Sequence, residues 1–442
     1  MAKISTAPLS GFMELTPGAQ LGFDRLKNTI QETYEAYGFT PLDTPTIERS
    51  EVLAAKVGVE TQKQIYQIKR DNNDLSLRFD LTVPLSRYVV EHQNDLVFPF
   101  RRCQIAKVFR GERAQKGRFR EFYQCDVDII GLGTLDINYD SEVIALINEV
   151  FTRLNLAKFK IRINNRQLIL GFLQALGVED QTEIITLIDK AEKLSQEKLD
   201  AELSLLRLNG LEKRQILKFV STRGSLATIQ KFFADLALPT NDNITTGLQD
   251  LASIDAALTA MSIPADNYIF DLTIVRGLDY YTGCIFETTL VDYSALGSVC
   301  SGGRYDKLAS SFSSQKMPGV GASIGLTRLF SQLSELGLVQ TKQKTVSQVA
   351  ILPLTENLAP VYQAASQLRQ AGLKVEIYLE PNSASKKFKY ADNLGVPYAL
   401  LIGDDEIKAE RFTLKNMQSG EQESLSLAQV IDVLSDVPSA RS

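Results

Sequence analysis

Between Phe122 and Ile130 the side chains alternate with a period of two residues. One set is polar and the other apolar: Gln124, Asp126 and Asp128 against Tyr123, Cys125, Val127 and Ile129. Successive side chains of a β-strand point to opposite faces of the sheet. We therefore expect a strand whose apolar face lies on a core and whose polar face looks onto water or a ligand.

A second strand is expected just before this one, over Gln104–Arg110. The connection from Gly111 to Glu121 is rich in cationic side chains, with two glutamates among them. These cations are Arg113, Lys116, Arg118 and Arg120. The pattern predicts a long hairpin with a cationic tip.

The rest of the first 165 residues predicts further parts of the same domain. Apolar residues spaced three and four apart indicate an amphipathic helix: Phe23, Leu26, Ile30, Tyr34 and Tyr37. Gly38 ends that helix, and the following extended segment contains Pro41 and Pro45, which suit an edge strand because proline lacks an N–H. Most of residues 75–130 is expected to be strand.

Three further regions differ in pattern. Residues 166–262 have leucine, glutamate and lysine at helical spacing, which predicts a helical insertion. Strands return in residues 263–340, which end with a helix. After a polar linker, residues 346–442 alternate strands with helices, and this predicts a separate α/β domain with a parallel sheet covered on both faces.

Composition excludes several classes of function. The chain has 442 residues but only one histidine and four scattered cysteines, so His/Cys zinc sites and Ser-His or Cys-His catalysis are nearly excluded. The net charge of -5 argues against a protein that coats DNA. Neither a membrane-spanning apolar run nor a secretory signal is seen, so we expect a cytoplasmic chain with no membrane contact and with reduced thiols.

Four segments combine an arginine with nearby glycine, acid, threonine or tyrosine. They are Leu77–Thr82, Phe109–Arg113, Val275–Tyr281 and Gly325–Arg328. Arginine binds phosphate and carboxylate in a planar, bidentate manner and keeps its charge. A single arginine of this kind is more often solvated or salt-bridged, but four around one sheet indicate a polyphosphate site that stabilises charge in phosphoryl or nucleotidyl transfer.

The order of these segments resembles the three motifs of class II aminoacyl-tRNA synthetases. Pro45 matches the motif 1 proline, Phe109–Arg113 matches motif 2, and Gly319–Arg328 matches motif 3. Arg276–Tyr281 and Ser301–Asp306 are similar to the two signature segments of histidyl-tRNA synthetases. The resemblance implies an α+β fold: an antiparallel-sheet catalytic domain with a helical insertion, followed by an α/β anticodon-binding domain.

The resemblance also implies a reaction and its site. The expected activity is that of a histidine–tRNA ligase, which activates histidine with ATP and loads it onto tRNA. Arg276 and Arg110 would act on the reacting groups, and Mg²⁺ would come with ATP rather than bind in a protein cage. The residues implied to bind ATP are Arg110, Glu112 and Arg328. The residues implied to bind histidine are Asp80, Thr82, Arg110, Gln124, Asp128, Arg276, Tyr280, Tyr281 and Tyr305.

Within that pocket Asp128 and Tyr281 would read the two imidazole nitrogens. Asp80, Thr82 and Gln124 would contact the α-amino group. The histidine-accepting tRNA is the implied partner, contacted near its acceptor end by Arg113 and Gln115. Lys386, Lys387 and Lys389 either meet tRNA phosphates or form a solvated helix face. The family's motif 1 implies a homodimer with two-fold symmetry.

Three alternatives stay open at this point. One is a regulatory paralogue that has this fold without aminoacylation. Another is a class II synthetase for proline, threonine or glycine. The last is a nucleic-acid-binding module with no catalysis.

Overall fold

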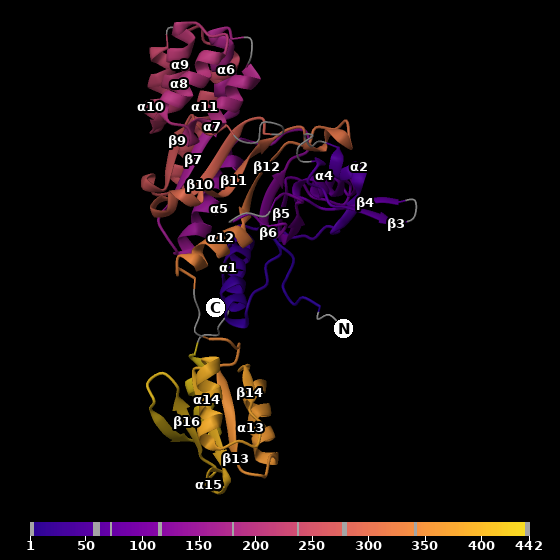
Figure 1. The fold of residues 1–442 in the computed structure, drawn as a ribbon, viewed down its shortest axis with the longest axis vertical. Coiled ribbons are helices and arrows are strands. Elements are labelled where there is room, and N and C mark those ends of the chain that lie inside the picture. The colour runs from indigo at the N-terminus through magenta and orange to yellow at the C-terminus, as the bar shows by residue number, and fades with distance from the viewer. Residues whose placement is uncertain are drawn as a thin grey trace. The chain divides into compact units, whose positions relative to one another are not determined.

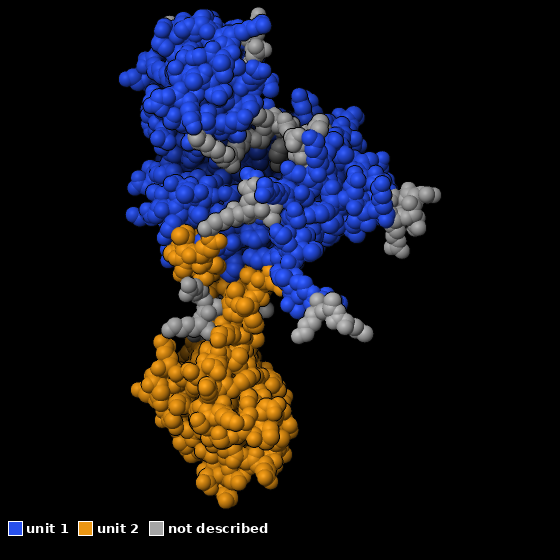
Figure 2. All heavy atoms as spheres, viewed as in Figure 1, with its two compact units in different colours: residues 1–13, 29–332 blue, residues 14–28, 333–442 orange. Residues whose placement is uncertain are grey.

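The computed structural model of the chain describes residues 4–55, 62–70, 73–113, 117–178, 181–236, 238–275, 281–339 and 343–437. The chain divides into two compact units (Figure 2). The first comprises residues 1–13 and 29–332, and the second comprises residues 14–28 and 333–442. No helix in these described ranges has both the length and the apolar character that crossing a bilayer requires.

The predicted N-terminal helix is present as α1, Pro17–Ala36. Proline suits its first position because the N–H it lacks has no partner inside a helix. Gly38 follows with a φ of 75°, a left-handed conformation that glycine adopts without strain and that stops the helix. Ile30 and Tyr34 are fully buried, and the Tyr34 hydroxyl donates a hydrogen bond to the carbonyl of Cys125 at 3.1 Å.

The first unit contains a sheet that comprises nine of the described strands (Figure 1). In spatial order they are β1 (Thr40–Pro41), β5 (Phe100–Phe109), β6 (Glu121–Ile130), β12 (Gly319–Gly325), β11 (Ser298–Tyr305), β10 (Cys284–Leu290), β7 (Phe159–Asn165), β9 (Tyr268–Asp271) and β8 (Arg223–Gly224). Neighbours are antiparallel except in the pairs β1–β5 and β7–β9. The expected antiparallel sheet and the 104–130 hairpin are confirmed.

The apolar face of β6 forms part of the core, as the alternation predicted. Cys125, Val127 and Ile129 are all fully buried. Helix α5, Asn138–Leu154, contacts β7 and β12 and buries Val143 and Ile147. One face of the sheet thus packs against an apolar layer, and the polar side chains of β6 lie on the opposite face.

The expectation that residues 75–130 are mostly strand was wrong in one place. Thr82–Glu91 is helix α4. The backbone N–H of Val83 donates to the Asp80 carboxylate at 3.1 Å, which compensates one unpaired donor of the first turn. Leu77–Thr82 is therefore the entry into a helix rather than a strand.

Helix α4 contacts α2 (Ser50–Ala54) and the short 3₁₀ helix η4 (Leu308–Ser311). A small antiparallel sheet with the order β2-β4-β3 belongs to the same unit. Its strands are β2 (Ile47–Arg49), β4 (Asn73–Leu77) and β3 (Gln67–Arg70).

The region 166–262 is helical apart from β8, as expected. Its helices are α6 (Arg166–Leu176), α7 (Gln181–Lys190), η1 (Ala191–Lys193), α8 (Gln196–Leu205), α9 (Gly210–Ser221), α10 (Leu226–Asp235) and α11 (Asp242–Ala260). Phe172 stacks on Phe219 with ring centroids 4.5 Å apart, and Phe232 packs against both. Two 3₁₀ helices, η2 (Ala265–Asn267) and η3 (Val291–Leu296), and helix α12 (Leu326–Glu335) complete the elements up to residue 340.

The second unit contains a five-stranded sheet among its described residues. In spatial order the strands are β14 (Val375–Ile377), β13 (Val349–Leu354), β15 (Tyr398–Gly403), β16 (Phe412–Asn416) and β17 (Gln422–Leu425). The helices are α13 (Ala359–Gln370), α14 (Ala384–Leu394), α15 (Asp404–Ala409) and α16 (Leu427–Ser435). Separate apolar clusters lie on the two sides of β13, one with α13 and α16 and one with α14.

The prediction of a covered α/β sheet is confirmed, but its parallel character holds for β14, β13 and β15 alone, because β16 and β17 are antiparallel. One of the three candidate tRNA-binding lysines is also placed differently. Lys387 is buried and its Nζ donates to the carbonyl of Pro353 at 2.6 Å, so it stabilises this unit. Lys386 and Lys389 are exposed.

Candidate active site

A row of polar residues crosses the middle of the large sheet. In the register of the strands, Gln104 of β5, Asp126 of β6, Ser323 of β12 and Ser301 of β11 are direct neighbours. Residues paired across antiparallel strands lie on the same face. The next such row contains Arg102, Asp128, Gly321 and Gly303. The polar face that the alternation predicted therefore extends over four strands.

Asp128 is at the centre of a buried polar cluster. Its Oδ2 lies 2.6 Å from Nη2 of Arg102, and its Oδ1 accepts a hydrogen bond of 2.6 Å from the Tyr305 hydroxyl. Burial raises the pKa of Asp128, and both Arg102 and Tyr305 oppose that shift. Because the arginine and the carboxylate are both almost fully buried, we regard Asp128 as the ionised partner of Arg102.

Glycines provide the space for this cluster. A Cβ atom on Gly321 would lie 2.2 Å from Oδ1 of Asp128, and one on Gly319 would lie 2.3 Å from the Tyr305 ring. A Cβ on Gly303 would lie 2.9 Å from the ring of Tyr281. Any side chain at these positions would therefore displace a group of the polar cluster, and the glycine-rich strands β11 and β12 are a requirement of the site.

Asp126 lies beside Asp128's row and is equally buried. Burial raises its pKa to about 7, because Arg102 lowers the pKa less than burial raises it and Asp128 adds repulsion. Two carboxyl groups thus share one buried arginine. The expected state near neutral pH is an ionised Asp128 with a partly protonated Asp126. The polar face of β6 was expected to look onto water or a ligand, and at these two residues, which are 2% and 3% exposed, it does not look onto water.

Asp80 and Thr82 lie where the chain enters α4. Burial raises the pKa of Asp80 to about 6, while the Val83 N–H and the positive charge of Arg110 lower it. Asp80 is therefore close to both Arg110 and Arg102, although it belongs to another part of the chain. Thr82 is the first residue of α4 and is 9% exposed.

The hairpin between β5 and β6 begins with Arg110. Its Nε donates to the carbonyl of Phe79 at 3.1 Å, and its guanidinium lies 5.0 Å from the centre of the Phe122 ring. Stacking and one hydrogen bond fix the guanidinium while most of its N–H donors stay available for an anion. Glu112 on the same loop accepts a hydrogen bond of 3.4 Å from Arg118.

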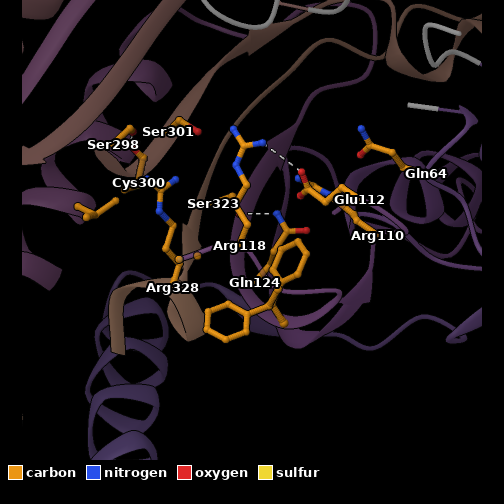
Figure 3. A pocket seen from close by; sticks show the side chains of 15 residues that line it. Gln64, Arg110, Glu112, Arg118, Gln124, Ser298, Cys300, Ser301, Ser323 and Arg328 are labelled. Atoms are coloured by element: carbon orange, nitrogen blue, oxygen red, sulfur yellow. Dashed lines mark hydrogen bonds and ion pairs between the residues drawn. The ribbon is translucent and has the colours of Figure 1, made fainter. Parts of the chain in front are cut away.

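A cavity of about 410 Å³ opens over this part of the sheet (Figure 3). Its lining combines three arginines of the described residues with hydroxyl, amide and carboxylate groups. The charged and amide residues are Gln64, Arg110, Glu112, Arg118, Gln124 and Arg328. Ser298, Ser301 and Ser323 add hydroxyls, and Phe119 and Phe122 add apolar surface. Such a lining suits a ligand that has several negative charges and a flat ring.

Gln124 lies between this cavity and the buried Asp128 cluster along β6. Its Nε2 donates to the Ser323 hydroxyl at 2.8 Å, whereas its Oε1 is buried without a hydrogen-bond partner within the described residues (Figure 3). A buried acceptor with no partner in a cavity wall indicates a place for a ligand donor. Arg328, at the other side of the cavity, donates from Nη2 to the carbonyl of Leu296 at 2.5 Å.

The structure brings most of the candidate residues onto this one face. Arg110, Glu112, Gln124 and Arg328 line the cavity, and Asp80, Asp128, Tyr281 and Tyr305 surround or adjoin the buried cluster. Arg113 is exposed on the hairpin loop. Arg276, Tyr280 and Gln115 lie outside the described residues.

One arginine of the four phosphate-directed segments does not belong to the site. Arg78 is buried, and it donates to the carbonyls of Lys107 and Thr44 and to the carboxylate of Asp43. Through these hydrogen bonds Arg78 connects strand β5 with the segment before α2. Tyr305 donates a hydrogen bond to Asp128, and its expected place in the lining of the histidine pocket stays a prediction.

Sequence reasoning missed three groups of this site. Arg102 has the same period-two position as Gln104, and the signal was lost because the predicted strand began at Gln104. Arg118 was noted only as part of a cationic loop, yet it lines the cavity together with Arg110 and Arg328 (Figure 3). Ser323 gave no signal, since a serine among glycines is unremarkable until the strand register places it beside Asp126.

Among the described residues, no cluster of three or more histidine, cysteine or acidic side chains has the geometry to hold a metal ion. The four cysteines Cys103, Cys125, Cys284 and Cys300 are free and buried. The chemistry that this face offers is therefore recognition by fixed cations, carboxylates and hydroxyls.

Comparison with known proteins places this geometry in a family. The family model for histidyl-tRNA synthetase matches residues 11–329, and the model for an anticodon-binding domain matches residues 348–436. The histidine–tRNA ligase of Clostridium tetani is 48% identical over 427 residues, covering 96% of this chain and 97% of the relative.

Solved structures agree with this assignment. The crystal structure of histidyl-tRNA synthetase from Nostoc sp. PCC 7120 has a TM-score of 0.91 and 40% identity, and covers 98% of this chain and 99% of its own. A structure from Bacillus halodurans C, described as an ATP phosphoribosyltransferase regulatory subunit/histidyl-tRNA synthetase, has a TM-score of 0.75 at 21% identity over 91% of this chain and 99% of its own. That second likeness shows the shared fold alone. The family match over most of the chain, together with relatives of high identity along its whole length, shows that this chain belongs to the histidyl-tRNA synthetase family.

Proposed function

We propose that this chain is a histidine–tRNA ligase, which joins histidine to AMP with release of pyrophosphate and then transfers the histidyl group to the 3′ end of its tRNA. The observation that carries the proposal is the adjacency of two sites on one sheet face. A buried carboxylate fixed by arginine and tyrosine lies at one end, and a cavity lined by three arginines of the described residues lies at the other.

The buried end suits an imidazole. Asp128 uses one acceptor direction on each oxygen for Arg102 and Tyr305, and a carboxylate has about four such directions, so it can still accept an imidazole N–H. We assign the second ring nitrogen to the Tyr281 hydroxyl. A side chain without both nitrogens would leave a buried group unpaired, which discriminates strongly against other amino acids.

The middle of the face suits the substrate's α-ammonium group. Gln124 offers a carbonyl oxygen to this ammonium group. We assign Asp80 and Thr82 as further partners of the ammonium group. Asp80 binds a cation only when ionised. Its pKa of about 6 therefore predicts that the free enzyme loses histidine affinity as the pH falls through 6.

The open end suits the triphosphate of ATP. We assign Arg110 to the α-phosphate and the histidine carboxylate, and Arg328 and Arg118 to the outer phosphates. Glu112 would contact the nucleotide or a magnesium ion that accompanies it. Magnesium, when bound with ATP, neutralises phosphate charge and is held by phosphate and water oxygens with few protein ligands.

In the first step a histidine carboxylate oxygen attacks the α-phosphorus in line, and the bond from that phosphorus to the bridging oxygen of pyrophosphate breaks. The oxygen that leaves keeps the electron pair. Arg110, joined by Arg276 as the family resemblance implies, would stabilise the negative charge that develops on the α-phosphoryl oxygens. No group of the protein needs to bond covalently to the substrate.

In the second step a hydroxyl of the terminal tRNA ribose attacks the histidyl carbonyl carbon. The bond from that carbon to the phosphate oxygen breaks, AMP leaves with this oxygen and the electron pair, and the hydroxyl proton passes to AMP or solvent. We propose that Arg113 and Gln115 approach the tRNA acceptor end. Tyr280 would line the histidine pocket beside Tyr281. These roles come from the resemblance of the hairpin loop and of the Arg276–Tyr281 segment to the family's motifs.

We also propose a domain organisation. Residues 1–165 and 263–340 would form the catalytic domain, interrupted by the helical insertion 166–262, and residues 346–442 would form the anticodon-binding domain. The family matches and the run of helices from α6 to α11 support this division. We expect a homodimer, which sedimentation equilibrium would detect as twice the mass of the chain. A cytoplasmic location fits the four free thiols, which are typical of reducing compartments.

The test is exchange of labelled pyrophosphate into ATP in the presence of each amino acid. Exchange with histidine alone, strongly reduced in Arg110→Ala and in Arg276→Ala, is the expected result. Folded protein that binds histidine without catalysing any exchange would instead favour the regulatory paralogue. Exchange with proline, threonine or glycine would move the assignment to another class II synthetase.

A further inference from the structure

We propose that Asp126 is a positioning residue, which acts through Ser323 to hold the Gln124 amide with its carbonyl oxygen toward the α-ammonium group of histidine. The inference rests on the proposed function. It adds a residue to which the family resemblance gave no role.

The Gln124 side chain has two ends of opposite character. The NH₂ group donates and the carbonyl oxygen accepts, and the two have nearly the same shape. In the structure Nε2 donates to Oγ of Ser323 at 2.8 Å, and Oε1 is left without a partner among the described residues (Figure 3). An acceptor attracts the substrate's ammonium group, whereas an NH₂ group turned toward it would repel it.

Ser323 alone cannot decide which end of the amide it meets. A serine hydroxyl accepts through its oxygen and donates through its hydrogen, so it can pair with either end of Gln124. The position of the hydroxyl hydrogen makes the choice. If that hydrogen points elsewhere, only the oxygen faces the amide, and only NH₂ can pair with it.

Asp126 provides the other partner for that hydrogen. It is the direct cross-strand neighbour of Ser323, so the two side chains lie on the same face of the sheet, within reach of each other. Hydrogen bonding from Ser323 lowers the pKa of Asp126, although burial keeps this pKa near 7. In its ionised form the Asp126 carboxylate can only accept, so in that form the donor sequence runs from Gln124 to Ser323 and from Ser323 to Asp126.

The environment of Asp126 also argues that it serves a purpose there. It is 2% exposed, its Oδ1 has no hydrogen-bond partner among the described residues, and it lies near Asp128 and Asp80, which are also acidic. A buried carboxyl group in such a place costs stability. An apolar residue or glycine would avoid that cost but would leave the Ser323 hydrogen free to turn toward Gln124.

The test replaces Asp126 with asparagine, which has nearly the same shape. Its NH₂ group can donate to Ser323, so the hydroxyl can donate to Oε1 of Gln124 and turn the amide around. Calorimetry would compare two ligands: histidine, and 3-(imidazol-4-yl)propionate, which is histidine without its α-amino group. We expect Asp126→Asn to lower the affinity for histidine about ten- to a hundred-fold, as for loss of a hydrogen bond to a charged group. The affinity for the propionate should stay unchanged.

Ser323→Ala and the double variant separate this role from a general electrostatic one. Because Asp126 acts through Ser323, adding Asp126→Asn to Ser323→Ala should change neither affinity further. The Ser323→Ala arm also keeps the test decisive if Asp126→Asn fails to fold, since it should lower histidine affinity and spare the propionate.

Equal losses for both ligands, unchanged histidine affinity, or additive effects in the double variant would overturn the inference. These results are distinct from failure of the proposed function, in which the wild-type protein would bind neither ligand or would bind histidine without catalysing any exchange. The exchange assay gives a second readout. The KM for histidine should rise in Asp126→Asn while the KM for ATP stays at the wild-type value.

Discussion

Replacing Tyr305 with phenylalanine removes one hydroxyl from the centre of the proposed histidine pocket. That hydroxyl donates to Oδ1 of Asp128 at 2.6 Å, and both side chains are buried. A hydrogen bond to a charged group contributes about 1.5–3 kcal/mol. If the loss falls on the histidine complex, affinity should decrease by about 10- to 150-fold, since about 1.4 kcal/mol is tenfold.

The same change should alter the pH dependence. Burial raises the pKa of Asp128 and the Tyr305 hydroxyl lowers it, so the variant has a higher Asp128 pKa than the wild type. Asp128 must be ionised to accept from imidazole. Histidine affinity should therefore fall off at a higher pH in the variant, and the deficit should be largest at the acidic end.

Pyrophosphate exchange at several pH values measures both effects through the KM for histidine. Tyr34→Phe is the matched control, because Tyr34 is also fully buried but donates to a backbone carbonyl, that of Cys125. We expect the KM for ATP to be unchanged in both variants. A Tyr305→Phe enzyme with the wild-type KM for histidine and the wild-type pH profile would refute the reasoning, as would an equal effect in Tyr34→Phe.

Gly321→Ala should abolish histidine binding and destabilise the fold by about 1–3 kcal/mol in urea unfolding, because its Cβ would lie 2.2 Å from Oδ1 of Asp128. Gly210→Ala should be near neutral, because its Cβ would make only an ordinary contact of 3.7 Å with the Arg214 side chain. Arg118→Ala should raise the KM for ATP about tenfold or more and leave the KM for histidine unchanged, since Arg118 lines the cavity and is not part of the buried Asp128 cluster. Equal changes in the two KM values would contradict this. The pKa of about 7 for Asp126 lies above its unfolded value, so the free energy of unfolding should fall as pH rises from about 4 to 7. Asp126→Asn should flatten that slope, and an unchanged slope would contradict the assignment.

Local periodicity was enough to predict much of the fold. The alternation in Phe122–Ile130 gave strand β6 and the correct division of its faces, because a single strand's pattern depends only on which face meets the core. The strand–helix alternation predicted after residue 346 is present in the order β13, α13, β14, α14 and β15 for the same reason. Gly38 ended α1 as expected, because a positive φ is a local requirement.

The secondary-structure predictions that were wrong or missing concern elements that depend on contacts with residues far away in the sequence. Thr82–Glu91 contains β-branched residues that favour a strand, but the Asp80 hydrogen bond to Val83 and burial against α2 make it a helix. The antiparallel strands β16 and β17 gave only a weak signal, since they are five and four residues long and no side chain of β17 is buried.

The site likewise combines features visible in the local sequence with contacts between residues far apart in the chain. The family resemblance named Asp128 and Tyr305 as pocket residues, but their direct contact and the buried Arg102 became visible only with the register of β5, β6 and β12. Arg78 had the same sequence signature as Arg110, and only its burial and its hydrogen bonds to Lys107, Thr44 and Asp43 separate it from the phosphate-directed arginines.

The most direct test of the account is transfer of labelled histidine to tRNA by the purified chain with ATP and magnesium. We predict acid-precipitable histidyl-tRNA with the wild type and a severe loss with Asp128→Asn, which keeps the shape of the side chain but removes the charge that pairs with Arg102. Folded wild-type protein that charges no tRNA with histidine, or a fully active Asp128→Asn variant, would contradict the assignment of this sheet face as the histidine-reading site of a ligase.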